Sequence, residues 1–296
     1  MLISAGCASA TKRSGPETTE PKPIGELVES TRVPEATGKF LADLDARIRA
    51  WTTLALSAQS LEDRRKASLL EQNLMYVTVN RVDELIEQLE TGPEQNQIVA
   101  AAGLGFTRDP RAQSPLIAAL DSKSNAVVAN ALLGLAILGR ADTPLAKVCV
   151  HLSASTDSWV RSNAAWCAAN LVQTGQRDGC ILDAARRGLA DQEPAVRSQC
   201  ALVLASLVDA ASLSDLAERL YDPVLLVRSA CARAIAYIGV ESPPDKGTAA
   251  RALVQAYEKA PEKEREPLLR AMVELAGTAT YGKEPQEWIE WSQRLP

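Results

Sequence analysis

The residues of this chain that could carry out chemistry are few, and their spacing does not suit it. There is one histidine, His151, and no Cys-x-x-Cys pair, whereas a zinc or iron centre needs several such ligands. Cys149 lies two residues before His151, but side chains two positions apart on a helix point about 200° away from each other, so the two cannot form a nucleophile pair. The Gly-x-Ser-x-Gly turn of hydrolases and the Gly-x-x-x-x-Gly-Lys-Ser/Thr phosphate loop are both absent from the sequence. We therefore expect no catalytic residue, no metal and no cofactor.

The balance of charges argues against nucleic acid as a partner. The chain has 296 residues, with 32 Lys and Arg and 37 Asp and Glu, which gives a formal net charge of −5. Nucleic-acid-binding proteins usually carry a basic stripe that neutralises phosphates, whereas the densest basic run here, residues 64–66, directly follows Glu62 and Asp63. No apolar run approaches the roughly 18 to 20 residues of a transmembrane helix.

The elements that must position any functional side chain are helices in a repeating pattern. Four segments share an Asp-containing turn, a Val-Arg-like pair and a helix rich in Ala or Cys. The aligned valines are Val127, Val160, Val196 and Val227, and the small residues four positions later are Ala131, Ala164, Cys200 and Cys231. The valines are 33, 36 and 31 residues apart, and such a period with helical spacing inside it predicts a solenoid of paired helices.

The segment from Asp222-Pro223 to Val227-Arg228 resembles the HEAT-repeat family, whose repeats read D-P-x-x-x-V-R-x-x-A-A-x-x-L-G. The resemblance implies an all-α fold, a right-handed α-α superhelix of about five to six helical hairpins. It also implies a structural ladder, in which each Arg pairs with turn Asp and main-chain carbonyl groups of neighbouring repeats; ligand binding by these arginines is the alternative. The expected ladder residues are Asp157, Arg161, Asp191, Arg197, Asp222 and Arg228.

One folded domain and a preceding tether make up the expected organisation. Residues 1–25 are rich in Ser, Thr, Pro and charge, so they cannot bury enough apolar surface to offset their ordering entropy, and we expect them to be disordered. Residues 26–296 form the expected solenoid, with N-terminal capping helices at 26–92, repeats at 93–277 and a C-terminal cap at 278–296.

The first residues, MLISAGCAS, resemble the lipobox of bacterial lipoproteins. On that resemblance signal peptidase cleaves before Cys7 and the Cys7 thiol is acylated, which makes Cys7 the expected lipidation site and the one expected link to a membrane. Ala8, where Asp would signal retention in the inner membrane, implies sorting to the outer membrane. The basic and apolar segments that secretion requires are missing, so we expect that the true start lies upstream or that the chain was trimmed. The alternative is an ordinary frayed terminus of a cytoplasmic protein.

The other five cysteines are expected to be small, buried, free thiols. Cys200 and Cys231 occupy equivalent positions in adjacent repeats, whose helices stack about 8 to 10 Å apart, too far for a disulfide. Cys149, Cys167 and Cys180 also lie within helix patterns. Free thiols fit a cytoplasm slightly better than a periplasm.

Two tryptophan pairs are the candidate partner-binding residues. Trp159 and Trp166 are seven residues apart, and Trp288 and Trp291 are three apart, so each pair shares one side of its helix. Packing is the alternative for both pairs, and for the second pair it would mean a lid on the last repeat.

Together these features favour a non-enzymatic protein–protein interaction scaffold of bacterial origin, located at the outer membrane or in the periplasm as a lipoprotein. The alternative is a cytoplasmic HEAT-like enzyme or cofactor-handling protein of the phycobilin-lyase type.

Overall fold

The computed structural model of this protein describes residues 36–57, 61–278 and 281–296. The chain divides into two units, Met1–Ala36 and Thr37–Pro296, and all helices of the described residues lie in the second. Cys7 and the expected tether at residues 1–25 lie outside the described residues.

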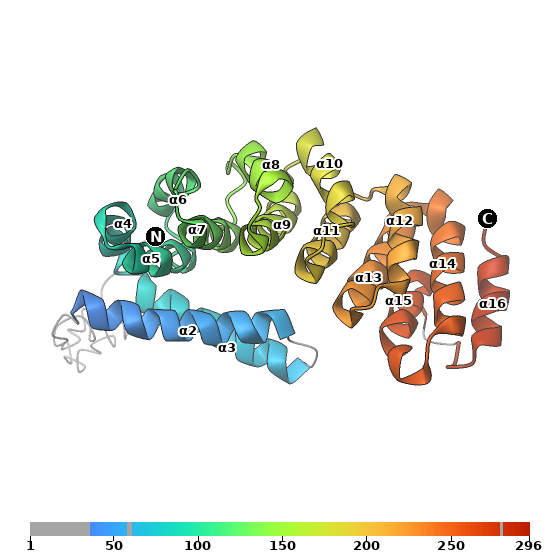
Figure 1. Cartoon of the computed structure of the whole chain (residues 1–296). Coiled ribbons are helices and arrows are strands. Elements are labelled where there is room, and N and C mark those ends of the chain that lie inside the picture. The colour runs from blue at the N-terminus through green and yellow to red at the C-terminus, as the bar shows by residue number, and fades with distance from the viewer. Residues whose placement is uncertain (1–35, 58–60, 279–280) are drawn as a thin grey trace, which may run out of the picture. The chain divides into compact units, whose positions relative to one another are not determined.

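Residues Thr37–Pro296 consist of helices arranged mainly in two rows, and the described residues contain no β-strand (Figure 1). The outer row is α4 (Val82–Thr91), α6 (Gln113–Ala119), α8 (Leu145–Ala154), α10 (Gly179–Gly188), α12 (Leu213–Glu218) and α14 (Lys246–Lys259). The inner row is α5 (Glu94–Phe106), α7 (Asn125–Leu138), α9 (Ser158–Gln173), α11 (Pro194–Ser206), α13 (Leu225–Glu241) and α15 (Glu266–Ala276). Each inner helix packs on the next inner helix and on the outer helix of its own pair. The predicted all-helical solenoid is confirmed.

The repeated residues of the sequence form the contacts between the rows. The four aligned valines and the four small residues that follow them are all buried, with at most 2% of any side chain exposed. The small residues let outer helices approach closely; a Cβ atom added to Gly188 of α10, for example, would collide with the Sγ atom of Cys200 on α11. Close approach of this kind gives the dense packing that an Ala-rich core needs in order to be stable.

The first two inner helices approach each other even more closely. Gly105 of α5 faces Gly134 of α7, and a Cβ atom on Gly105 would lie only 2.5 Å from the Gly134 carbonyl oxygen and 2.8 Å from its Cα atom. Any side chain at this crossing would force the two helices apart.

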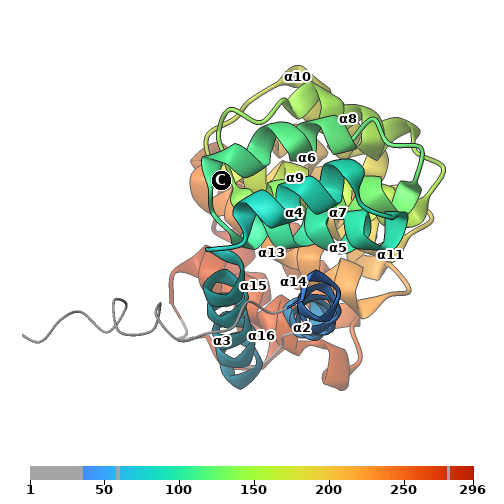
Figure 2. The ribbon, with the colours of Figure 1, turned by 90° about the vertical axis from the view of Figure 1, so that its left-hand side faces the viewer.

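Helices α2 (Thr37–Ser57) and α3 (Leu61–Thr78) form a hairpin that lies against the inner row. Leu44 of α2 packs over Gly103 of α5, which has no side chain to hold it away. The Trp51 ring contacts Phe106 of α5 and Trp166 of α9, with ring centroids 5.1 and 6.2 Å apart. Because α7 lies between α5 and α9, α2 runs along the row and crosses the axes of the inner helices, as Figures 1 and 2 show. The boundary expected at residue 92, between the capping helices and the repeats, falls between α4 and α5. These two helices form the first pair of the two rows.

The other end of the solenoid is covered by α16 (Pro285–Gln293), which packs on α14. Trp288 is fully buried and Trp291 is 8% exposed, and both rings contact Tyr281. The Trp288 Nε1–H group donates a hydrogen bond to the Gly282 carbonyl oxygen, 3.0 Å away. These two tryptophans therefore form the lid on the last repeat and are not available to a partner in this state.

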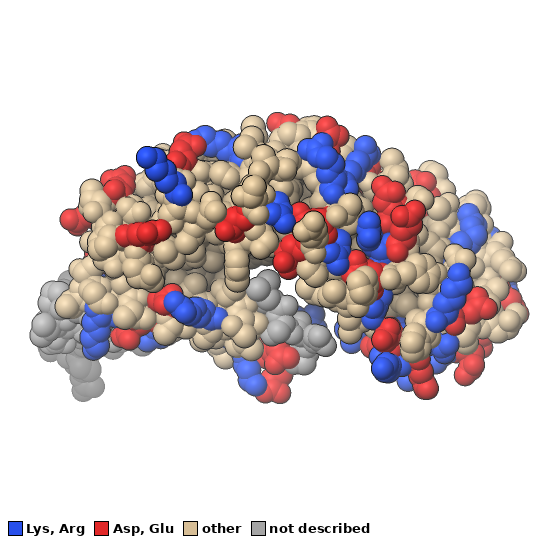
Figure 3. Space-filling model, viewed as in Figure 1, with Lys and Arg blue, Asp and Glu red and all other residues tan. Residues whose placement is uncertain are grey.

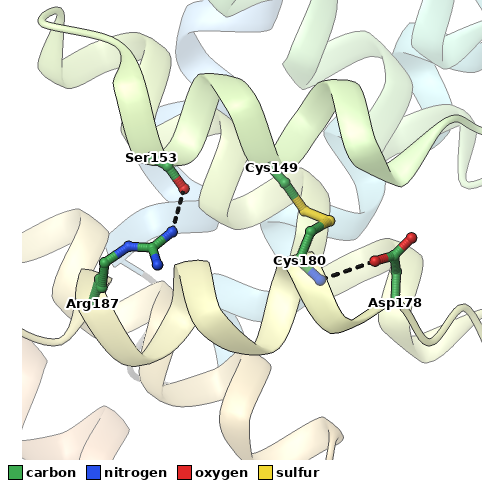
Figure 4. Close-up of a disulfide and its surroundings, with 5 residues drawn as sticks. All are labelled: Cys149, Ser153, Asp178, Cys180 and Arg187. Carbon is green, nitrogen blue, oxygen red and sulfur yellow. Dashed lines mark hydrogen bonds between the residues drawn. A yellow bond between two sulfur atoms is a disulfide. The ribbon is translucent and has the colours of Figure 1, made fainter.

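One expectation about the cysteines is wrong. Cys149 of α8 and Cys180 of α10 form a disulfide that joins two neighbouring outer helices, with Cα atoms 6.1 Å apart (Figure 4). The spacing of helix axes does not limit this distance, because two residues that face each other lie closer together than the axes do. Cys167, Cys200 and Cys231 are free and buried, as expected. Burial raises the pKa of the Cys231 thiol to about 12, and it also raises the pKa of the other two.

Candidate functional site

The arginines that recur at the start of the inner helices tie each repeat to the next. Arg161 of α9 donates from Nε and Nη2 to the two carboxylate oxygens of Asp191, over 2.8 and 2.9 Å. Arg197 of α11 binds Asp222 in the same way, also over 2.8 and 2.9 Å. Two parallel hydrogen bonds of this kind fix orientation as well as distance.

The same arginines also satisfy the carbonyl groups of their own turns. Arg197 Nη1 donates to the carbonyl oxygens of Asp191 and Gln192, over 2.8 and 3.0 Å. Arg228 of α13 repeats this pattern at its own turn and pairs with Glu264 instead of an aspartate, over 2.9 Å. We call Arg161, Arg197 and Arg228 with their carboxylate partners the arginine ladder. All three guanidinium groups form hydrogen bonds and ion pairs within the protein. Their role here is therefore structural, and they do not present free donors to a ligand.

Aspartates of these turns also cap the main chain. Asp222 Oδ1 accepts a hydrogen bond from the Val224 N–H group over 2.9 Å. Asp157, which was expected in the ladder, pairs with no arginine among the described residues; its Oδ1 accepts from Trp159 and Val160 at the start of α9. Burial alone would raise the pKa of the Asp222 carboxyl, but the bonds from Arg197 and Val224 outweigh it and hold this pKa below its ordinary value. The pKa of Asp191 is lowered in the same way, against the effect of its burial.

The inner face of the solenoid is covered at one end and open further along. Every α5 residue from Val99 to Phe106 and nearly every α7 residue after Val127 is buried, because the α2–α3 hairpin lies on this side of the row. Helical segments that are almost entirely apolar, such as residues 98–106 of α5 and 131–138 of α7, need neighbours on every side. Beyond the hairpin, Figure 3 shows the surface hollowed beneath α9 and α11, on the side facing α13.

Helix α13 presents a stripe of exposed apolar side chains to this open region. Apart from its terminal residues Leu225 and Glu241, its exposed residues are Leu226 (50%), Arg233, Tyr237 (42%) and Val240 (44%). They recur every three to seven residues and therefore lie along one side of the helix. Since α12, α14, α11 and α15 occupy the other sides, this stripe faces the open inner face. It was not predicted from the sequence, although the i, i+7, i+11 and i+14 spacing of these residues in an Ala-rich helix was the available signal.

The two tryptophans of α9 have different surroundings. Trp159 is 65% exposed, the highest value for any described aromatic residue. Trp166 is half-buried because Trp51 covers part of it. Between α9 and α13, α11 presents the smaller Ala195 and Gln199 and the half-buried Leu202. Figure 3 shows acidic and basic side chains intermixed over the visible face. The result is a shallow trough, here called the inner trough, walled by Trp159 and Trp166 on one side and by the α13 stripe on the other.

A separate cavity of about 200 Å³ lies at the turns between the last two pairs. It is lined mainly by apolar groups, among them Tyr221, Leu225 and Pro267, and the Arg228–Glu264 pair lies at its edge. The Lys259 ammonium lies 5.6 Å from the centre of the Tyr221 ring. This cavity is on the turn edge of the rows and does not belong to the inner trough.

No group of His, Cys, Asp and Glu among the described residues could hold a metal ion. His151 lies on α8, where burial lowers its pKa. Among the described residues, no helix is both long and apolar enough to cross a membrane.

Comparison with known proteins agrees with this architecture. A designed armadillo repeat protein shares 20% identity and a TM-score of 0.51 over 66% of this chain and 99% of its own. An engineered protein shares 19% identity and a TM-score of 0.51 over 87% and 76% of the two chains, and computationally designed armadillo repeat proteins for modular peptide recognition share 20% and 0.50 over 65% and 99%. At these identities the similarity establishes the fold alone. A search of curated proteins finds no match.

The family is established by the sequence itself. A profile of HEAT repeats matches residues 82–169 and 145–236, which together span more than half of the chain. The first match begins at α4, where the two rows of helices begin. The chain belongs to the HEAT-repeat family.

Proposed function

We infer that this chain is a non-enzymatic scaffold that binds a protein partner through its inner trough. The observation that carries this inference is the contrast along the inner face. The hairpin packs on α5, and residues 99–106 of α5 are all buried. Trp159, Leu226 and Tyr237 stay 42 to 65% exposed a short distance further along. Exposed aromatic and aliphatic side chains that gather on one concave surface are typical of an interaction site.

The rigidity of the solenoid suits such a role. The arginine ladder and the disulfide hold neighbouring repeats together, so the trough does not have to be ordered when a partner binds. A surface that is already ordered loses less conformational entropy on binding. The fold is also compatible with polypeptide binding, since designed proteins of similar fold were made for modular peptide recognition.

The proposed location is the bacterial cell envelope, through a lipid anchor at Cys7. The Cys149–Cys180 disulfide supports this location, because disulfides persist in oxidising compartments and are rare in a reducing cytoplasm. The three free thiols are compatible with it too, since they are buried and so protected from oxidants.

The partner is tested by photo-cross-linking in cells that make the protein. A photoreactive amino acid is placed at Tyr237 in the trough, or at Val150 on outer helix α8, which is 61% exposed and serves as a matched control. A polypeptide that cross-links from position 237 and not from position 150 supports the scaffold. Equal yields from the two positions, or none from 237, contradict it.

The anchor is tested by mass spectrometry of the N-terminal peptide of the native protein. A mature chain that begins with diacylglyceryl-modified Cys7 supports the envelope tether. An unmodified Cys7 peptide contradicts it and leaves the scaffold to be judged by the cross-linking.

A further inference from the structure

The protein already holds one amphipathic helix on its inner face. Helix α2 begins beside α4, where the Thr37 hydroxyl donates to Glu84 Oε1 over 2.6 Å. Its Trp51 reaches Trp166 of α9, and the helix ends at Ser57. Its apolar side is at most 6% exposed at every contact position. These positions are Phe40, Leu41, Leu44, Ile48 and Trp51.

The contacts of α2 extend over more than one inner helix. Leu44 packs over Gly103 of α5, and Trp51, seven residues later, contacts Phe106 of α5 and Trp166 of α9. Seven residues of α-helix extend about 10.5 Å, and packed helices lie about 8–10 Å apart. A helix that runs along the row can therefore place one apolar side chain on each successive inner helix. An extended peptide places side chains of one side about 6.7 or 13 Å apart, which fits the row less well.

The surface that holds α2 continues beyond it. Trp166 contacts Trp51 and is only partly buried. Leu202 of α11 and Tyr237 of α13 follow on the next two inner helices, and both are accessible to solvent. Two steps along the row, from α9 to α13, correspond to about 11 to 13 residues of helix.

One charge in the trough has no counterpart. Arg233 is exposed on the α13 stripe between Leu226 and Tyr237, and it makes no ion pair or hydrogen bond with any described residue. The ladder arginines differ from it, because each has a carboxylate partner. A cation placed between apolar anchors favours a partner with a carboxylate at the matching position.

Building on the proposed function, we propose that the inner trough binds an amphipathic helix of the partner protein in line with α2. This helix inserts apolar side chains seven residues apart over α11 and α13, and it pairs an Asp or Glu with Arg233.

The test uses a phage-displayed library of random 16-residue peptides, selected on the full-length protein. A protein with Trp159→Ala and Tyr237→Ala serves as the counter-target; both residues are exposed, so the variant keeps its core. The proposal expects enriched peptides with apolar residues at i, i+3 or i+4, and i+7, and with one Asp or Glu. Their circular dichroism should become helical on binding.

Charge reversal at Arg233 makes the test specific. Arg233→Glu should weaken the selected peptides about tenfold or more, and selection on this variant should exchange the acidic position for Lys or Arg. Arg187→Glu on outer helix α10 makes the same change of charge away from the trough and should leave both results unchanged.

Other outcomes overturn the helix proposal. They are peptides without helical spacing, peptides that bind Arg233→Glu equally well, and no enrichment over the counter-target. A cross-link from position 237 would still support the proposed function in each of these cases, so failure of one proposal is distinguishable from failure of the other.

Discussion

Removal of Arg197 should weaken this solenoid more than removal of any other ladder arginine. The guanidinium makes two bonds to Asp222 and two to main-chain carbonyl groups. The Asp222 side chain is 1% exposed and that of Arg197 is 10% exposed. Arg197→Ala leaves the carboxylate buried with the Val224 N–H group as its remaining donor, and removal of one partner from a buried ion pair costs about 3–5 kcal/mol.

The exposure of the other rungs predicts an order of effects. The side chains of Arg161 and Asp191 are 16 and 14% exposed, and those of Arg228 and Glu264 are 20 and 32% exposed. Water can solvate the abandoned carboxylate better where it is more exposed, so Arg161→Ala should cost less than Arg197→Ala, and Arg228→Ala least.

The assay is urea unfolding at pH 7, followed by circular dichroism. The slope with urea must be compared between variants, because solenoids can unfold in parts. Arg233→Ala is the control, since loss of an exposed side chain without partners usually changes the free energy of unfolding by no more than about 0.5 kcal/mol. If Arg197→Ala costs no more than this control, the ladder does not stabilise the fold and the reasoning is refuted.

Three further predictions concern acid, the disulfide and the crossing of α5 with α7. The ladder aspartates Asp191 and Asp222 have pKa values below their ordinary range. Their contribution to stability is therefore complete above the unfolded pKa of about 3.9 and disappears as the pH falls through their lower folded pKa values. A melting temperature that stays constant from pH 5 to pH 2 would contradict this. The disulfide closes a loop of sequence separation 31, so the double variant Cys149→Ala, Cys180→Ala should lose about 3–4 kcal/mol of unfolding free energy, measured with urea. If both cysteines can be alkylated in the denatured protein without prior reduction, the bond does not form. Gly105→Ala should lower the free energy of unfolding by about 1–3 kcal/mol, because the added methyl group meets the backbone of Gly134. The control is Gly38→Ala, where a Cβ atom meets nothing within 4 Å. Equal stability of the two variants would rule out the close crossing of α5 and α7.

The two rows of helices could be predicted from the sequence because equivalent residues of successive repeats occupy the same buried environment. Val160, Val196 and Val227 each enter the core at the same point of a pair, and the residue four positions later must be small. Local spacing therefore carries the information, and the profile match and the solenoid agree with it.

The cover over the inner face could not be predicted in the same way. The spacing of Phe40, Leu44 and Trp51 shows that α2 buries one side, but it does not say which surface receives that side. The almost entirely apolar second half of α7, residues 131–138, was the missing clue, because a helical segment with no polar side needs neighbours all round. The position of the open trough depends on which inner helices are covered. For this reason Arg233 and Tyr237 could not be identified from the sequence as trough residues either.

The disulfide left a signal that was read wrongly. Cys149 and Cys180 are 31 residues apart, which is close to one repeat period, so they occupy related positions on successive outer helices. The distance between helix axes was used only to exclude a bond between Cys200 and Cys231, and the matching positions of Cys149 and Cys180 were not compared. The Cα atoms of two facing residues are closer together than the two helix axes, because both atoms lie between the axes.

The most direct test of the central claim is the affinity of the cross-linked partner for the purified protein, measured by titration calorimetry. The wild-type protein is compared with Trp159→Ala, Tyr237→Ala and the outer-face control Val150→Ala. If the inner trough is the binding surface, loss of a central aromatic anchor should raise the Kd about tenfold to a hundredfold, while Val150→Ala leaves it unchanged. Unchanged affinity in both trough variants, or an equal loss in Val150→Ala, would contradict the claim that the partner binds there.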